Sequence, residues 1–136
     1  MKSILVLDDE FNLLKLVCRL LQRHGYRTLQ AGSADEALRL FRDNRGDIDL
    51  FIVDICLPAG SGIQVAIDLR VDLPDLHILL VSGYPENAWS ARDSALFHAL
   101  GSHLVSILQK PFTPQVLMNR VDRLLGAAPP EVAKTA

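Results

Sequence analysis

The sequence is poor in cysteine. Its 136 residues include only Cys18 and Cys56, which lack the CxxC spacing of redox and zinc motifs. Two cysteines are too few for the disulfide framework of a small secreted domain, so we expect two unpaired thiols. Unpaired thiols are typical of a reducing compartment, and we therefore predict a cytoplasmic location.

The chain also lacks an excess of one charge and any long apolar run. It has 14 basic and 16 acidic residues, which give a formal net charge of −2 and no basic surface for nucleic acid or lipid. The apolar run before Asp8 is too short for a signal peptide, and no stretch reaches transmembrane length. We predict neither direct nucleic-acid binding nor membrane contact by this chain.

The chain does contain a regular alternation of short apolar runs and helical periodicity. The hydrophobic share of 49% is enough for one buried core. Apolar runs predict strands at 4–7, 26–30, 50–53, 77–81 and 104–109. Helical spacing predicts helices at about 10–24 and 34–44, a third reaching residue 70, a fourth within 84–101, and a last one between Thr113 and Gly126. The apolar positions of the first helix are Phe11, Leu14, Val17, Cys18 and Leu21.

Strands that alternate with helices predict right-handed crossovers and a parallel sheet covered on both faces. The fold class is therefore α/β, a doubly wound three-layer sandwich. We place the domain at 1–126. Residues 127–136 contain Pro129-Pro130 and no apolar period, so they are predicted to be a flexible C-terminal tail or the start of a linker.

Five polar side chains follow the ends of these strands. Asp8 and Asp9 come after the first strand, Asp54 after the third, Ser82 after the fourth and Lys110 after the fifth. Because the carboxyl ends of parallel strands share one edge, we expect these groups to meet in one crevice. Three neighbouring carboxylates repel one another unless a cation is bound, and oxygen ligands suit Mg²⁺. Without a His or Cys cluster, zinc is disfavoured.

Four motifs occupy these positions. They are Asp8-Asp9, the segment 54–62 (DICLPAGSG), Ser82-Gly83 and Lys110-Pro111-Phe112. Together, over residues 3–125, they resemble bacterial response-regulator receiver domains, the CheY-like domains of two-component systems. The resemblance implies a flavodoxin-like fold with a five-stranded parallel sheet in the order 2-1-3-4-5.

The resemblance also implies a role for each residue. Asp54 would accept a phosphoryl group from a sensor histidine kinase or a histidine phosphotransfer protein. Asp8 or Asp9, Asp54 and the backbone carbonyl of Cys56 would hold Mg²⁺, Ser82 would hydrogen-bond the phosphoryl group, and Lys110 would neutralise its charge. Such a chain is a signalling phosphoacceptor that catalyses only its own phosphorylation and dephosphorylation. The family usually has a cis bond before the proline of its lysine-proline motif, although most X-Pro bonds are trans.

The output region departs from the family pattern. The family usually carries Tyr or Phe three residues before the lysine, and Ile107 stands there in this chain. Ile107 has no ring to swing between two positions, and its β-branched side chain is stiff about its first torsion. The segment from Ser82 to Lys110 is also longer than usual. We therefore expect Ser82 and the segment 84–101 to carry the conformational change more than the fifth strand does.

A second apolar stripe on the first helix suggests a docking surface. Leu13, Leu16 and Leu20 lie on a different face from the core positions. They would contact the histidine kinase or phosphotransfer protein, or else simply widen the core face. We expect the output to reach an effector protein, a second copy of the chain in a homodimer, or a domain outside this chain.

Other functions fit the sequence less well. A haloacid-dehalogenase-like phosphatase needs Asp-x-Asp after its first strand, whereas this chain has Asp8-Asp9-Glu10. A flavodoxin needs a Ser/Thr/Gly-rich phosphate loop there, and a P-loop motif is absent from the sequence. The main alternative is a pseudo-receiver, a protein-interaction module that keeps the fold without phosphoryl turnover. The intact set of acidic, hydroxyl and lysine positions favours the phosphoacceptor.

Overall fold

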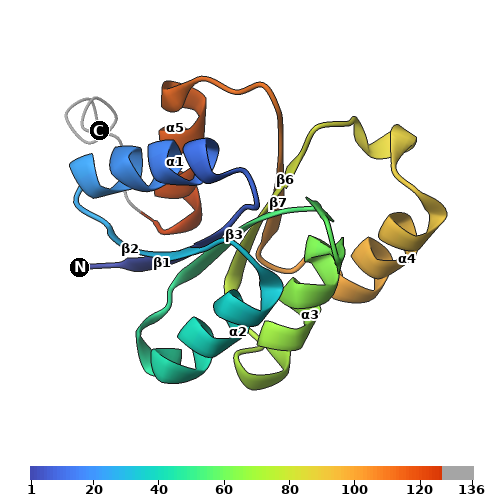
Figure 1. Ribbon diagram of the computed structural model, residues 1–136, viewed down its shortest axis with the longest axis horizontal. Coiled ribbons are helices and arrows are strands. Elements are labelled where there is room, and N and C mark those ends of the chain that lie inside the picture. Colours follow the sequence, from blue (N-terminus) through green and yellow to red (C-terminus); the bar gives the residue numbers. More distant parts are fainter. Residues whose placement is uncertain (127–136) are drawn as a thin grey trace.

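The computed structural model describes residues 1–126, which form a five-stranded sheet covered by helices and a small two-stranded sheet (Figure 1). The strands are β1 (Ser3–Leu7), β2 (Arg27–Ala31), β3 (Leu50–Asp54), β4 (Cys56–Leu57), β5 (Gly60–Ser61), β6 (His77–Ser82) and β7 (Val105–Gln109). The helices are α1 (Phe11–Arg23), α2 (Ala34–Asp43), α3 (Gly62–Asp72), α4 (Ala91–Leu100) and α5 (Pro114–Leu124), with 3-10 turns η1 (Arg45–Asp47) and η2 (Glu86–Ala88). The predicted tail at 127–136 lies outside the described residues.

The main sheet is parallel, with the strand order β2-β1-β3-β6-β7. Helices α1 and α5 cover one face, and α2, α3 and α4 cover the other (Figure 1). The central strands β1 and β3 are buried along their whole length, as expected of strands covered on both faces. The predicted doubly wound fold and its strand order are confirmed.

Helix α1 shows why the apolar period predicts a packed face. Leu14, Val17, Cys18 and Leu21 are buried against the sheet as predicted. Phe11 shares the apolar spacing of these residues but is 64% exposed. Phe11 is the first residue of the helix, and the Lys15 ammonium lies 4.9 Å from its ring centroid.

Two segments differ from the predicted elements. The loop before α3 contains a small antiparallel hairpin formed by β4 and β5, which are too short to leave a pattern in the sequence. In the segment 84–101, only α4 and the short η2 are helical. Ser90 caps α4 by accepting a hydrogen bond from the Asp93 amide, so the helix begins well after β6 ends.

Strand β7 forms one edge of the sheet and is tied to α5. Arg120 donates hydrogen bonds to the Ser106 hydroxyl at 2.8 Å and to the Ile107 carbonyl at 2.7 Å. Thr113 caps α5, and Pro114 opens its first turn, as predicted. Within the described part of the chain, no helix has the length and apolar character needed to cross a membrane.

Candidate functional site

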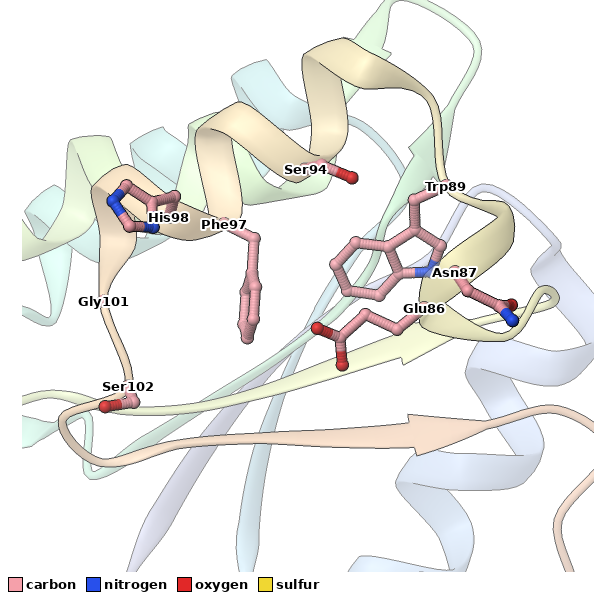
Figure 2. A pocket seen from close by; sticks show the side chains of 8 residues that line it. All are labelled: Glu86, Asn87, Trp89, Ser94, Phe97, His98, Gly101 and Ser102. Carbon is pink, nitrogen blue, oxygen red and sulfur yellow. The ribbon is translucent and has the colours of Figure 1, made fainter.

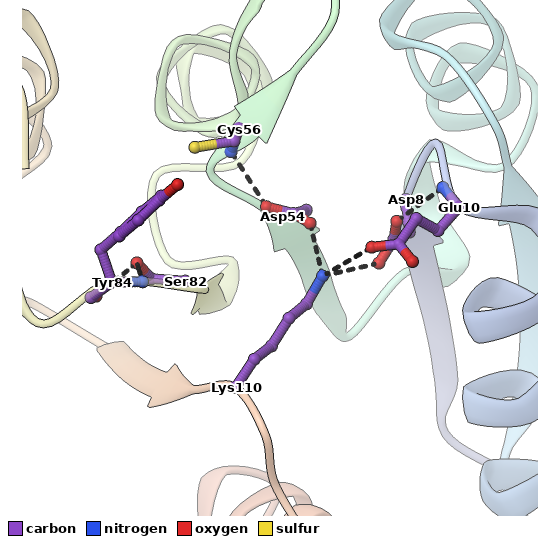
Figure 3. A network of polar contacts seen from close by, with 7 residues as sticks. All are labelled: Asp8, Glu10, Asp54, Cys56, Ser82, Tyr84 and Lys110. Carbon is purple, nitrogen blue, oxygen red and sulfur yellow. Dashed lines mark hydrogen bonds and ion pairs between the residues drawn. The ribbon is translucent and has the colours of Figure 1, made fainter.

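The strand register brings the predicted residues to one edge of the sheet. Leu7 pairs with Val53, Asp54 pairs with Val81, and Ser82 pairs with Gln109. The predicted residues therefore stand at or directly after the carboxyl ends of adjacent strands. The backbone N–H of Lys110 donates to the Ser82 carbonyl at 2.7 Å and extends this alignment to the end of β7. Figure 3 shows the resulting network around Asp54.

Lys110 joins the acidic groups. Its Nζ donates to Asp54 Oδ2 at 2.7 Å and lies 3.7 Å from Asp8 Oδ2 and 3.5 Å from Glu10 Oε1 (Figure 3). Burial lowers the pKa of Lys110, but the hydrogen bond to Asp54 and the three negative charges outweigh burial and raise the pKa above its ordinary value. Lys110 is therefore charged near neutral pH. The bond between Lys110 and Pro111 is cis, which decides the isomer that the sequence left open.

The carboxylates of Asp8, Glu10 and Asp54 offer ligand atoms within 4.8 Å of one another. Asp8 and Asp54 are buried, and burial raises the pKa of Asp8 although Lys110 and a backbone N–H from Glu10 act against the rise. Buried, crowded carboxylate oxygens with no His or Cys among them fit a hard divalent cation. This donor set is suited to Mg²⁺.

Asp9 and Glu10 differ in their position relative to the carboxylate cluster. Asp9 is exposed and does not belong to the three-carboxylate cluster, whereas Glu10 does. The chain turns after β1, with the Glu10 N–H donating to Asp8 Oδ1 at 2.8 Å, and this turn brings the Glu10 carboxylate back toward Lys110. The third acidic residue of the Asp-Asp-Glu run was the only sequence signal for Glu10.

Cys56 orients the Asp54 carboxylate. Its backbone N–H donates to Asp54 Oδ1 at 2.9 Å, so both oxygens of Asp54 are held, one by Cys56 and one by Lys110. Burial and then the charge of Asp54 raise the pKa of the Cys56 thiol. Cys18 and Cys56 are both free, as predicted.

Ser82 is buried at the end of β6, but its hydroxyl is bonded away from Asp54. It donates to the Tyr84 carbonyl at 2.7 Å and accepts from the Tyr84 N–H at 3.1 Å and from Trp89 Nε1 at 3.0 Å. In the described part of the chain the Ser82 hydroxyl has no hydrogen bond to Asp54 or Lys110. The hydrogen bond from Trp89 to Ser82 leaves no signal in the sequence, and Trp89 was not among the predicted site residues.

The remaining predicted residues lie on two other faces. Ile107 pairs with Leu80 and packs, half-buried, in the layer that includes α4. Leu16 is 50% exposed, whereas Leu13 and Leu20 are half-buried against the core. All three leucines line a groove of about 270 Å³ whose opposite wall includes Pro111 and Phe112. The stripe therefore both widens the core face and leaves an apolar groove beside Lys110.

The comparisons with known proteins agree with this geometry. Residues 4–122 match the family described as response regulator receiver domain. The chain belongs to this family. It is therefore a signalling domain of two-component systems, as the motifs predicted.

Relatives place such a domain in several kinds of protein. The chain is 31% identical over 123 residues to the sensor kinase CckA of Brucella abortus, covering 90% of this chain and 12% of that protein. It is 32% identical over 126 residues to the transcriptional regulatory protein PhoP of Bacillus subtilis, covering 91% of this chain and 48% of that protein. The chain thus spans half or less of these two relatives. A crystal structure of the response regulator TrrA from Thermotoga maritima, in complex with Mg²⁺ and BeF, matches with a TM-score of 0.73 and 34% identity over 92% of this chain and 100% of that chain.

Proposed function

We propose that this receiver domain, residues 1–126, accepts a phosphoryl group on Asp54 from a phosphohistidine donor. The observation that carries the proposal is the contact of Lys110 Nζ with Asp54 Oδ2 at 2.7 Å, beside Asp8 and Glu10. This arrangement combines a held carboxylate nucleophile, a fixed positive charge and a cluster of oxygen ligands. Phosphoryl transfer needs such positioning and charge stabilisation more than it needs proton transfer.

In the transfer, the Asp54 carboxylate attacks phosphorus in line with the departing imidazole. A P–O bond forms as the P–N bond breaks, and the electron pair of the P–N bond stays on the imidazole nitrogen, which then takes up a proton. Lys110 moves from the free carboxylate to the phosphoryl oxygens and balances their charge. Ser82 would donate a hydrogen bond to the same group once its hydroxyl turns toward Asp54.

Asp8, Asp54 and the Cys56 carbonyl would hold Mg²⁺, with Glu10 within reach. Bound Mg²⁺ would offset the negative charge that collects on the phosphoryl oxygens. The complex of TrrA with Mg²⁺ and BeF supports this assignment. Because Asp9 is exposed and outside the cluster, Asp8 is the stronger choice of the two aspartates.

The donor would be a sensor histidine kinase or a histidine phosphotransfer protein that docks on α1. Lys110, which bonds Asp54, lines the groove between α1 and Phe112, so a helix lying in this groove could bring its histidine near Asp54. The kinase CckA among the relatives supports a phosphorelay partner. As a signalling domain of this type, the chain would act in the cytoplasm and catalyse only its own phosphorylation and dephosphorylation.

The test is uptake of phosphoryl from acetyl phosphate with Mg²⁺, followed by the mass of the intact chain. We expect the wild type to gain one phosphoryl group and Asp54→Asn to gain none. Asp47→Asn, an exposed aspartate in η1, is the matched control and should label like the wild type. A folded wild-type chain that never gains mass would instead be a pseudo-receiver, and labelling of Asp54→Asn would place the acceptor elsewhere.

A further inference from the structure

Trp89 links the Ser82 hydroxyl to α4. It is the only tryptophan of the sequence and follows η2. Its Nε1–H donates to Ser82 Oγ, with an N···O distance of 3.0 Å, and to the Tyr84 carbonyl, with an N···O distance of 3.2 Å, so one N–H is shared between two acceptors. Its ring meets the ring of Phe97 edge to face, with centroids 5.4 Å apart and an angle of 85° (Figure 2).

These contacts use the full hydrogen-bonding capacity of the Ser82 hydroxyl. A hydroxyl has one proton to donate and two lone pairs to accept with. The proton goes to the Tyr84 carbonyl, and the lone pairs accept from the Tyr84 N–H and from Trp89. A phosphoryl group on Asp54 offers only acceptor oxygens in this direction, so Ser82 can bond it only by taking its proton away from Tyr84.

Turning the hydroxyl also moves its lone pairs. The hydroxyl oxygen swings about the Cα–Cβ bond of Ser82, and the bond from Trp89 Nε1 loses its acceptor. The hydrogen bond from Trp89 Nε1 to the backbone carbonyl of Tyr84 can remain. The hydrogen bond from Trp89 Nε1 to the buried Ser82 hydroxyl cannot persist once that hydroxyl points toward Asp54.

We propose that Trp89 is a positioning residue that holds the Ser82 hydroxyl away from Asp54 and is released when Asp54 carries a phosphoryl group. The proposal rests on the proposed function of Asp54. Because the indole packs on Phe97, its release passes directly to α4. An open groove of about 730 Å³, lined by Trp89, Phe97, Glu86 and Ser102, gives the ring space to move (Figure 2).

This assignment supplies the aromatic group that β7 lacks. Ile107 packs in the same layer as Trp89 and Phe97 but has no group that could bond Ser82. The hydrogen-bonding ring in this chain therefore comes from the segment between β6 and α4. A tryptophan that only fills space would pack on Phe97 equally well without the bond to Ser82.

The first test uses the fluorescence of Trp89, which reports on this one site because no other tryptophan exists in the chain. Beryllofluoride with Mg²⁺ stands in for the phosphoryl group, and its binding is followed independently by calorimetry. We expect saturating beryllofluoride to shift the wild-type emission spectrum. Ser82→Ala should show the shifted spectrum before addition and no further shift at saturation.

The second test is a double-mutant cycle on beryllofluoride affinity. Trp89→Phe keeps a ring against Phe97 and removes the N–H, so we expect it to tighten binding about 2- to 10-fold, the range for one hydrogen bond lost from the competing state. In the Ser82→Ala background the same change should leave the affinity unaltered. Any loss of packing is common to both backgrounds and cancels in the cycle.

The outcomes separate the two proposals. Binding by calorimetry with an unchanged wild-type emission overturns the role of Trp89 and leaves the proposed function intact. An equal effect of Trp89→Phe in both backgrounds does the same, because it reduces Trp89 to packing. A wild-type chain that neither binds beryllofluoride nor gains mass from acetyl phosphate overturns the proposed function, and the role of Trp89 with it.

Discussion

Gly62 is the first residue of α3 and lies against the backbone of Asp54, the proposed phosphoacceptor. Its N–H donates to the Ile55 carbonyl at 2.8 Å, and a Cβ on Gly62 would collide with the backbone carbonyl of Asp54 and the side chain of Val53. We expect Gly62→Ala to lower the free energy of unfolding by about 1–3 kcal/mol, as overpacking does in a rigid core. Urea denaturation measures the change.

Gly46 provides the matched control for this substitution. It lies in η1, and a Cβ there would meet nothing within 4 Å. Gly46→Ala should leave the free energy of unfolding almost unchanged or raise it slightly, because alanine restricts the unfolded chain. Equal losses at Gly62 and Gly46 would show that backbone crowding behind Asp54 is not the cause.

At the residue scale, the positions where strands end in the sequence predicted the central residues of the site. The residues around them are placed by local turns, which the sequence pattern did not predict. Asp54, Asp8 and Lys110 meet because parallel strands end at one edge, which periodicity can reveal. Glu10 and Trp89 reach the site through the turn after β1 and through η2. Their backbone paths depend on individual hydrogen bonds that leave no period in the sequence.

The exposed stripe of α1 gives a prediction at the scale of one helix. Leu16 is 50% exposed and lines the groove that Lys110 also lines. With Leu16→Glu, we expect transfer from a phosphorylated kinase or phosphotransfer protein to slow at least about fivefold, since a charge in an apolar interface typically costs more than 1 kcal/mol. Labelling by acetyl phosphate, which needs no docking, should keep its wild-type rate.

Val71→Glu serves as the control for the added charge. Val71 is 77% exposed on α3, away from the groove. This variant should match the wild type in both reactions. If Leu16→Glu slowed acetyl phosphate labelling as much as protein-dependent transfer, the helix would be damaged and docking would remain undemonstrated.

His77 makes the stability of β6 depend on pH. Burial, followed by the positive charges of Arg70, Lys2 and His103, lowers its pKa below the ordinary 6.5. Among residues 1–126, its Nδ1 has no hydrogen-bond partner. The unfolded state therefore binds a proton more readily than the folded state, so stability falls as the pH drops below about 6.5. The loss from this one group is at most about 1.4 kcal/mol per pH unit.

Unfolding free energies at pH 7.5 and 5.5 test this sign. His77→Asn cannot be protonated in this range, so it should lose less stability than the wild type between the two pH values. His98→Asn, at an exposed position of α4, controls for the loss of an imidazole. A wild type that gained stability relative to His77→Asn on acidification would contradict the predicted direction.

The sequence predicted helices and strands well where they bury an apolar face against the core, and poorly where they bury little. The strands of the main sheet and α1, α2 and α5 bury apolar faces, and burial imposes the period that the sequence shows. Helix α4 has no fully buried residue, and the β4–β5 hairpin has two residues per strand. Weak burial and short length left no periodic signal there.

Mg²⁺ should stabilise the whole molecule, because three crowded carboxylates exist together only in the folded chain. A ligand that binds the folded state alone adds about 2.7 kcal/mol at one hundred times its dissociation constant. We expect the midpoint of thermal unfolding to rise with Mg²⁺ concentration in the wild type. Asp8→Asn should abolish most of this rise, and Asp9→Asn should retain it.

The pair of aspartate variants decides between the two ligand assignments that the sequence left open. A rise that survives in Asp8→Asn and disappears in Asp9→Asn would reverse the assignment made from the structure.

The predicted reordering of residues 84–101 on phosphorylation is a separate expectation. It concerns the segment that contains Trp89 and α4, and it stays a prediction.

The contacts of Arg120 also affect whether the edge of the sheet can pair with another copy of the chain in a concentrated solution. Among the strands of residues 1–126, β7 pairs only with β6, so its outer side carries backbone groups that another chain could use to continue the sheet. Arg120 covers part of this side by bonding the Ile107 carbonyl and the Ser106 hydroxyl. The guanidinium of Arg120 thus shields part of the edge of β7 from pairing with another chain.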